Sequence, residues 1–269
     1  MKSAVTIALV PEITKGPWVY WNSLEEGMQK ASELGFDAVE LFTASGKILD
    51  AEYVRALAAK YKLLIAAVGT GAGKVVQGLT LTDEDPSVRL KAIAFIQEMI
   101  TFGAALGAPA IVGSMQGNVQ PAGRNQSLQW LAEGLNTLGK TAEQSGFPLI
   151  YEPLNRYETN LFNQLGEAVA FLETLDSKNV KLLADLFHMN IEEASIAAAI
   201  ERYAAYIGHI HFADSNRQAI GFGHTDMKEI AATLKKINYK GYLSAEIFPL
   251  PDSDAAAAQT IQAYRTWFS

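Results

Sequence analysis

The chain of 269 residues contains no cysteine. Disulfide bonds, thiolate nucleophiles and iron–sulfur clusters are therefore excluded, and the absence fits a cytoplasmic location, which is the one we expect. Long apolar runs are missing too, because the first apolar stretch, residues 4–10, is far shorter than a membrane-spanning helix. It also lacks a small-residue cleavage site. The sequence thus predicts no membrane partner.

Positive charge is scarce as well. The 22 lysines and arginines are outnumbered by 29 acidic residues, the net charge is −7, and no basic block occurs. Binding to a phosphate backbone draws on the release of counterions by clustered basic residues, so we expect no nucleic-acid partner. With 49% hydrophobic and 19% charged residues, the composition is that of a globular protein with a large core.

Short apolar segments recur eight times along the chain, each followed by a longer segment with helical periodicity. The apolar segments begin near Ala4, Ala38, Leu64, Pro109, Pro148, Val180, Ile207 and Tyr242. Alternating strands and helices imply right-handed crossovers and a parallel sheet. Eight such units predict an α/β fold, a single parallel (β/α)8 TIM barrel, with an open doubly wound sheet as the alternative. Because no linker or low-complexity tract divides the chain, we expect one domain over residues 1–269.

Helix boundaries support this division. Residues 23–26 form a capping box, and Asp85 followed by Pro86 places a cap before a proline at the first helical position. Glycines follow helical segments where a left-handed C-terminal residue is favoured, at Gly35, Gly107 and Gly146.

Acidic residues lie at the carboxyl ends of three predicted strands. These residues are Glu152, Asp185 and Glu246, and the strand between the last two ends with His211. Parallel strands are covered on both faces, so an ionised carboxylate there is costly unless it is paired or bound to a metal. Any one such acid is more often a helix cap or a structural ion-pair partner, but four polar residues in one register are harder to explain in that way.

A divalent cation would resolve the repulsion between three converging carboxylates. Three carboxylates and one neutral imidazole suit Mn²⁺, Mg²⁺ or Co²⁺ better than structural zinc. The carboxyl-end face is also where barrel enzymes do their chemistry. We therefore predict one metal ion held by Glu152, Asp185, His211 and Glu246. His209 faces the same way as His211, one layer deeper, so we expect it either to support the site or to be an ordinary hydrogen-bonded core histidine, and not to bind the metal.

Three motifs make the chain resemble a known family: EPLNRYE at residues 152–158, ADLFHM at 184–189 and HIHFADSNR at 209–217. Over nearly its whole length, the chain resembles the xylose-isomerase-like sugar isomerase/epimerase superfamily and, within it, the D-tagatose 3-epimerase group, including members similar to 5-keto-L-gluconate epimerases. The resemblance implies a metal-dependent barrel, with manganese as the first choice, and a homodimer or homotetramer. It also implies that Glu152 and Glu246 exchange the proton.

Further site residues are implied by the same resemblance, which matches His188, Arg217 and Glu158 with contacts to the sugar oxygens. Taken alone, His188 is an ordinary loop histidine about as often as a ligand contact, and Arg217 is usually a solvated cation. Glu158 could equally be a structural partner of Arg156. Two more candidates rest on position. Glu40 is either an acid that supports the site or a capping group, and Trp18 belongs to a loop that forms either an apolar lid or an ordinary packing or oligomer contact.

The predicted function is metal-dependent inversion of the carbon next to the carbonyl, C3, of a ketose or keto-sugar acid through an enediolate. Ketohexose enzymes of the group carry Gly-Glu where Ala213 and Asp214 stand here, which leaves the substrate open. A keto acid would need a further cation, for which Arg124 and Lys15 are the candidates. An isomerase of the aldose–ketose, hydroxypyruvate or inosose type could use the same site. A non-catalytic metal-dependent sugar-binding protein is the other alternative. With four histidines in the chain, a multi-zinc abasic-site endonuclease is disfavoured.

Overall fold

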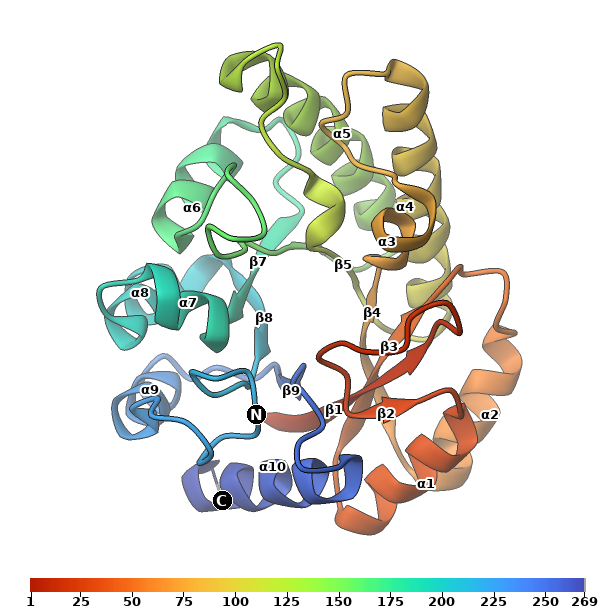
Figure 1. Cartoon of the computed structure of the whole chain (residues 1–269), viewed down its shortest axis with the longest axis vertical. Coiled ribbons are helices and arrows are strands. Elements are labelled where there is room, and N and C mark those ends of the chain that lie inside the picture. The colour runs from red at the N-terminus through yellow and green to blue at the C-terminus, as the bar shows by residue number, and fades with distance from the viewer. Residues whose placement is uncertain (269) are drawn as a thin grey trace.

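The computed structural model describes residues 1–268 and shows a closed parallel barrel, as predicted. Eight strands follow one another around the ring, and β1 pairs with β9 to close it (Figure 1). They are β1 (Lys2–Leu9), β3 (Ala38–Thr43), β4 (Leu64–Gly69), β5 (Ala110–Val112), β6 (Leu149–Tyr151), β7 (Val180–Asp185), β8 (Ile207–His211) and β9 (Tyr242–Ala245). The open-sheet alternative is therefore wrong.

The strands begin within two residues of their predicted starts. Those expected at Pro109 and Pro148 begin one residue later, at Ala110 and Leu149, because proline has no N–H to donate to the sheet. A two-residue strand that the sequence did not predict, β2 (Tyr20–Trp21), pairs with the end of β1. It turns part of the first loop into an extension of the sheet.

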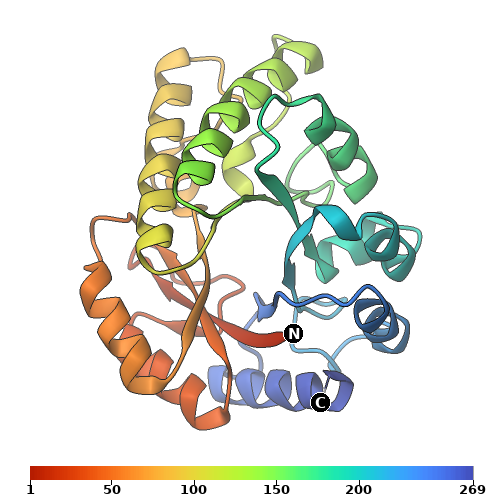
Figure 2. The same cartoon turned by 180° about the vertical axis from the view of Figure 1, so that it is seen from behind.

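The helices form a ring around the strands in both views (Figures 1 and 2). The outer helices are α1 (Leu24–Leu34), α2 (Ala51–Tyr61), α4 (Pro86–Ala105), α5 (Arg124–Gln144), α6 (Leu165–Thr174), α8 (Ile196–Arg202), α9 (Met227–Lys236) and α10 (Ser253–Phe268). Shorter turns lie in the connecting loops: α3 (Ala72–Gln77), α7 (Leu186–Glu192), η1 (Ser114–Gln116) and η2 (Ala204–Tyr206). No helix among residues 1–268 is long and apolar enough to cross a membrane.

The predicted helix boundaries are confirmed. Ser23 accepts a hydrogen bond from the Glu26 N–H and begins α1, while Asp85 caps α4 with Pro86 at its first position. The three predicted glycines, Gly35, Gly107 and Gly146, all have a positive φ. The helices therefore pack on the barrel as the hydrophobic periodicity indicated, and the loops after each strand are left free to build one face.

Candidate active site

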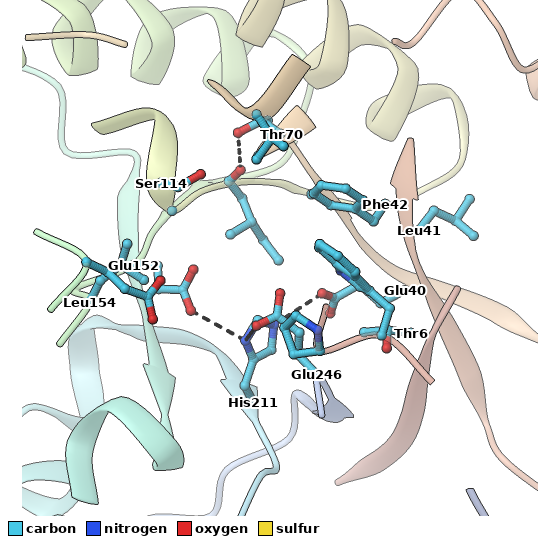
Figure 3. Close-up of a pocket in the computed structure, with 18 of the residues that line it drawn as sticks. Thr6, Glu40, Leu41, Phe42, Thr70, Ser114, Glu152, Leu154, His211 and Glu246 are labelled. Atoms are coloured by element: carbon cyan, nitrogen blue, oxygen red, sulfur yellow. Dashed lines mark hydrogen bonds and ion pairs between the residues drawn. The ribbon is translucent and has the colours of Figure 1, made fainter. Parts of the chain in front are cut away.

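Four polar side chains converge at the carboxyl ends of four consecutive strands. Glu152 follows β6, Asp185 ends β7, His211 ends β8 and Glu246 follows β9. One ligand atom from each residue lies within 4.8 Å of those of the others. His211 Nδ1 is 3.3 Å from Asp185 Oδ2, 3.4 Å from Glu152 Oε1 and 3.6 Å from Glu246 Oε2. The structure thus brings together the four residues that we selected as metal ligands. Figure 3 shows Glu152, His211 and Glu246 pointing toward one another.

The electrostatics of this cluster favour an added positive charge. Burial, reinforced by the charges of Glu152 and Asp185, raises the pKa of Glu246 to about 7, although His211 and Arg217 oppose the rise. Burial disfavours a charged His211, yet Glu40 and Glu246 hold its pKa well above the ordinary value. A cation at the centre of the carboxylates would therefore stabilise the cluster, since a proton on His211 supplies only part of the positive charge.

The residues present fit a divalent metal ion. Glu152 Oε1 is buried and has no hydrogen-bond partner among the described residues, so one strong acceptor remains free. The donor set consists of three carboxylates and one imidazole, which are hard ligands. An ion that accepted lone pairs from all four residues would satisfy Glu152 Oε1 and remove the like-charge repulsion.

Arg217 joins two of the acids on the loop side of the cluster. Its guanidinium donates to Glu246 Oε2 at 2.8 Å and to Glu158 Oε1 at 3.2 Å, and it lies over the Phe187 ring. Its backbone has φ 58°, which is unusual for a residue with a side chain. Arg217 and Glu158 are therefore a bonded pair at the site, and Arg156, the expected partner of Glu158, instead bonds Glu192.

His188 lies beside the acids on α7. Its Nε2 is 3.7 Å from Asp185 Oδ2 and 4.0 Å from Glu152 Oε1, and has no hydrogen-bond partner within residues 1–268. Its Nδ1 accepts a hydrogen bond from the Asn155 backbone N–H at 3.3 Å. Nδ1 is therefore the unprotonated nitrogen, and Nε2–H is left as a buried donor that points at the cluster.

Glu40 and His209 lie beneath the cluster. Glu40, in the middle of β3, is hydrogen-bonded to both His209 Nε2 and His211 Nε2. The three residues are buried. Glu40 is therefore no helix cap, and His209 occupies the deeper layer that its spacing indicated.

A cavity of about 210 Å³ opens beside the cluster. One wall is aromatic, because Trp18 stacks on Phe42 with ring centroids 4.2 Å apart. Trp18 is only 9% exposed, so in this structure it is a packed wall of the cavity. Arg217 is the only lysine or arginine that lines the cavity in residues 1–268. Arg124 instead bonds the carbonyls of Asn160 and Leu161, and Lys15 lies in a separate groove, so neither candidate for a second cation is confirmed.

Two supports of Glu152 went unrecognised in the sequence. A Cβ on Gly113 would lie 2.4 Å from Glu152 Oε2, so glycine is needed for this carboxylate to fit. Gln116 donates to the carbonyls of Gly113 and Glu152 and accepts from the Tyr151 hydroxyl, which ties the end of β5 to the end of β6. Nothing in a single sequence distinguishes this glycine or this glutamine from others, because their role depends on contacts between two strands.

Comparison with known proteins agrees with the fold. The chain belongs to the xylose isomerase-like TIM barrel family, whose model matches residues 28–267. It is 33% identical over 228 residues to the D-psicose 3-epimerase of Agrobacterium fabrum, covering 82% of this chain and 78% of the relative. It is 30% identical over 235 residues to the L-ribulose 3-epimerase of Mesorhizobium japonicum, covering 84% and 76% respectively. The protein is thus an isomerase, a carbohydrate epimerase.

A solved structure extends the comparison to a different position of epimerisation. The apo form of 3-keto-D-glucoside 4-epimerase from Escherichia coli superposes with a TM-score of 0.83 at 26% identity, covering 99% of both chains. The chain is therefore similar to enzymes named for inversion at two different carbons.

Proposed function

We propose that the protein is a metal-dependent epimerase that inverts C3 of a small ketose by a two-glutamate proton exchange. One observation carries the proposal: Glu152 and Glu246, from β6 and β9, flank the same nitrogen of His211 at 3.4 and 3.6 Å beside the cavity. Two carboxylates that approach one centre from different strands can serve its two faces. Inversion requires removal of a proton from one face and its return on the other.

The reaction follows from the groups in place. Glu152 removes the proton from C3 and leaves an enediolate. Glu246 delivers a proton to the opposite face, and Arg217 holds its carboxylate through a bond of 2.8 Å. The Nε2–H of His188 donates to a sugar oxygen, and Glu158 with Arg217 orients the neighbouring hydroxyls. The reverse reaction exchanges the roles of the two glutamates.

A divalent metal ion completes the site, and Mn²⁺ is our first choice, ahead of Mg²⁺ and Co²⁺. Glu152, Asp185, His211 and Glu246 would hold it. When bound, it supplies positive charge that stabilises the negative oxygen formed as the proton leaves carbon.

The charge of the cavity favours a neutral ketose over a keto-sugar acid. Its one lining cation in residues 1–268, Arg217, is already bonded to Glu246 and Glu158. A substrate carboxylate or phosphate would therefore meet several acids and no free cation. An aldose–ketose isomerase, which would act at C1 and C2, is the second candidate because it would use the same groups.

Three broader proposals accompany this function. We propose that residues 1–269 form a single domain, that the protein is a homodimer or homotetramer, and that it works in the cytoplasm. Exposed apolar side chains near the loops of the active face, including Val75, Tyr157 and Leu250, support self-association.

The decisive experiment follows deuterium from D₂O into the substrate. The Mn²⁺-loaded protein is incubated with D-fructose, D-tagatose or 5-keto-L-gluconate, and the products are identified by NMR. We expect deuterium at C3 of a neutral ketose and formation of its C3 epimer. Replacing the base by an amide, Glu152→Gln, should lower the rate by about 10²- to 10⁴-fold. Glu98→Gln is the matched control, because Glu98 is bonded to Ser45 and Lys47 away from the cavity.

The other possible outcomes of this experiment would indicate a different mechanism or function. Label at C1 or C2 would replace the epimerase by the isomerase. Full exchange in Glu152→Gln would contradict the two-glutamate mechanism. Sugar binding without any exchange would indicate the binding protein.

A further inference from the structure

We propose that Glu40 is a positioning residue that fixes the tautomer of His211 and turns its Nδ1 toward the metal. The inference rests on the metal site of the proposed function. Glu40 lies on β3, outside the run of strands β6 to β9 that carry the four ligands, and its carboxylate points toward His211 inside the barrel (Figure 3).

The two oxygens of Glu40 are used by two different histidines. Oε2 lies 2.7 Å from His209 Nε2, and Oε1 lies 3.1 Å from His211 Nε2. The Glu40 residue is 4% exposed, and both histidines are 1% exposed. Because each oxygen has its own partner and the residue is almost completely buried, the carboxylate has one orientation in which both bonds form.

These bonds determine which nitrogen of His211 is available to a cation. A carboxylate only accepts hydrogen bonds, so His211 Nε2 must carry the proton that it shares with Glu40. Nδ1 is then the nitrogen that can give up its proton to a bound ion, and it faces three carboxylate oxygens at 3.3 to 3.6 Å. The ring therefore spans two acidic layers: it donates to Glu40 in the lower layer and would offer its Nδ1 lone pair to an ion held by the upper one.

The same contact adjusts the strength of the ligand. A negative carboxylate on the far nitrogen of an imidazole makes the near nitrogen a better electron donor and holds the ring plane in place. His209 has the complementary task of occupying the second oxygen of Glu40. Without it, the carboxylate could rotate and release His211.

A second cation between Glu40, His209 and His211 is the competing interpretation, since their ligand atoms also lie within 4.8 Å of one another. The separations of 2.7 and 3.1 Å from Glu40 are those of hydrogen bonds between an N–H and a carboxylate. Binding an ion there would also require His211 to give up its proton from Nε2 while Nδ1 binds the first ion. The geometry therefore favours one ion and a hydrogen-bonded support.

The first test measures Mn²⁺ binding by calorimetry on the full chain without substrate. Glutamine at position 40 keeps one acceptor oxygen and loses the other, so Glu40→Gln should weaken Mn²⁺ binding by about 10- to 100-fold. Glu40→Asp keeps the charge but is shorter, and we expect a smaller loss. Glu98→Gln, a carboxylate outside the cavity, should bind as the wild type does. An unchanged dissociation constant in a folded Glu40→Gln protein would overturn the inference, and so would two ions per wild-type chain with one lost in this variant.

The second test reads the tautomer directly and needs no variant. With Mg²⁺ as a diamagnetic ion, long-range ¹H–¹⁵N correlation spectra of the ¹⁵N-histidine protein should show His211 protonated at Nε2; a proton on Nδ1 would overturn the inference even if Glu40→Gln fails to fold. The two proposals fail separately. A wild type that binds no metal and exchanges no deuterium contradicts the proposed function, whereas a metal-dependent epimerase insensitive to Glu40 contradicts only the role of Glu40.

Discussion

The two glutamates of the site have unlike surroundings. Glu246 is bonded to Arg217, while Glu152 has no lysine or arginine beside it in residues 1–268 and is instead confined by the glycine backbone at Gly113. Glu246 is thus positioned by charge, through its ion pair with Arg217. Glu152 is positioned by shape, through the space that the backbone at Gly113 leaves for it. An enzyme whose reaction runs in both directions needs two acid–base groups, but the fold can place them by different means.

The largest expected effect, a loss of kcat, comes from displacing Glu152, the carboxylate that is positioned by shape. Gly113→Ala would place a methyl group 2.4 Å from Glu152 Oε2, so the carboxylate must move. A shift of about 1 Å in a reacting group can lower the rate about 100-fold, and we expect that loss in kcat at saturating Mn²⁺. Steady-state kinetics measures it.

Gly134→Ala in α5 is the control for Gly113→Ala, because its Cβ would press only on the flexible Leu81 side chain, 3.1 Å away. A Gly113→Ala enzyme with wild-type kcat would show that Glu152 tolerates displacement, and the contrast between the two glutamates would lose its meaning.

A smaller effect concerns the competition between protons and Mn²⁺ at Glu246, the carboxylate that is positioned by charge, and at His211. The pKa of Glu246 is raised to about 7 and that of His211 lies well above its ordinary value, so a metal ion must displace protons from both. Mn²⁺ affinity should therefore fall as the pH is lowered through about 7, by about tenfold per pH unit for each proton released. Calorimetry in buffers of different ionisation enthalpy counts these protons.

Glu246→Gln tests this assignment, because at pH values well below 7, where Glu246 is protonated, it should remove one proton from the count. An affinity that does not change with pH would contradict the proton competition. The same count before and after the substitution would place the proton elsewhere.

The smallest effect lies in the loop that carries Arg217. Asp214 accepts backbone hydrogen bonds from Ser215, Gly221 and Thr225. Asp214→Asn should lower the free energy of unfolding by about 1–3 kcal/mol, because an amide cannot accept all of these bonds. Urea unfolding measures the change, and an unaltered midpoint would show that the loop does not depend on this carboxylate.

The effect of pH on this loop has a definite sign. Burial alone would raise the pKa of Asp214, but the surrounding backbone N–H groups lower it overall from its ordinary value of 3.8. The stabilisation is therefore complete above that value and is lost as the pH falls through the lower pKa of the folded state. Asp214→Asn should abolish this part of the acid sensitivity.

The sequence predicts residues whose position follows from strand order, and it misses those that depend on contacts between loops. Glu152, Asp185 and His211 could be placed together because carboxyl ends of parallel strands meet on one face. Gly113 could not, because its function is to leave space for a side chain on the next strand. Trp18 was ambiguous for a similar reason: its stacking on Phe42 joins the first loop to the end of β3, and no periodicity reveals that contact.

The closure of the barrel through β1 and β9 also sets the order in which the site can form during synthesis. All four proposed ligands lie between residues 152 and 246, and the last of them follows β9, the strand that pairs with β1 to close the ring. A nascent chain that ends before β9 has three of the four ligands and an open ring. Capture of an ion by all four ligands therefore requires β9, which carries Glu246 to the site by pairing with β8 on one side and β1 on the other.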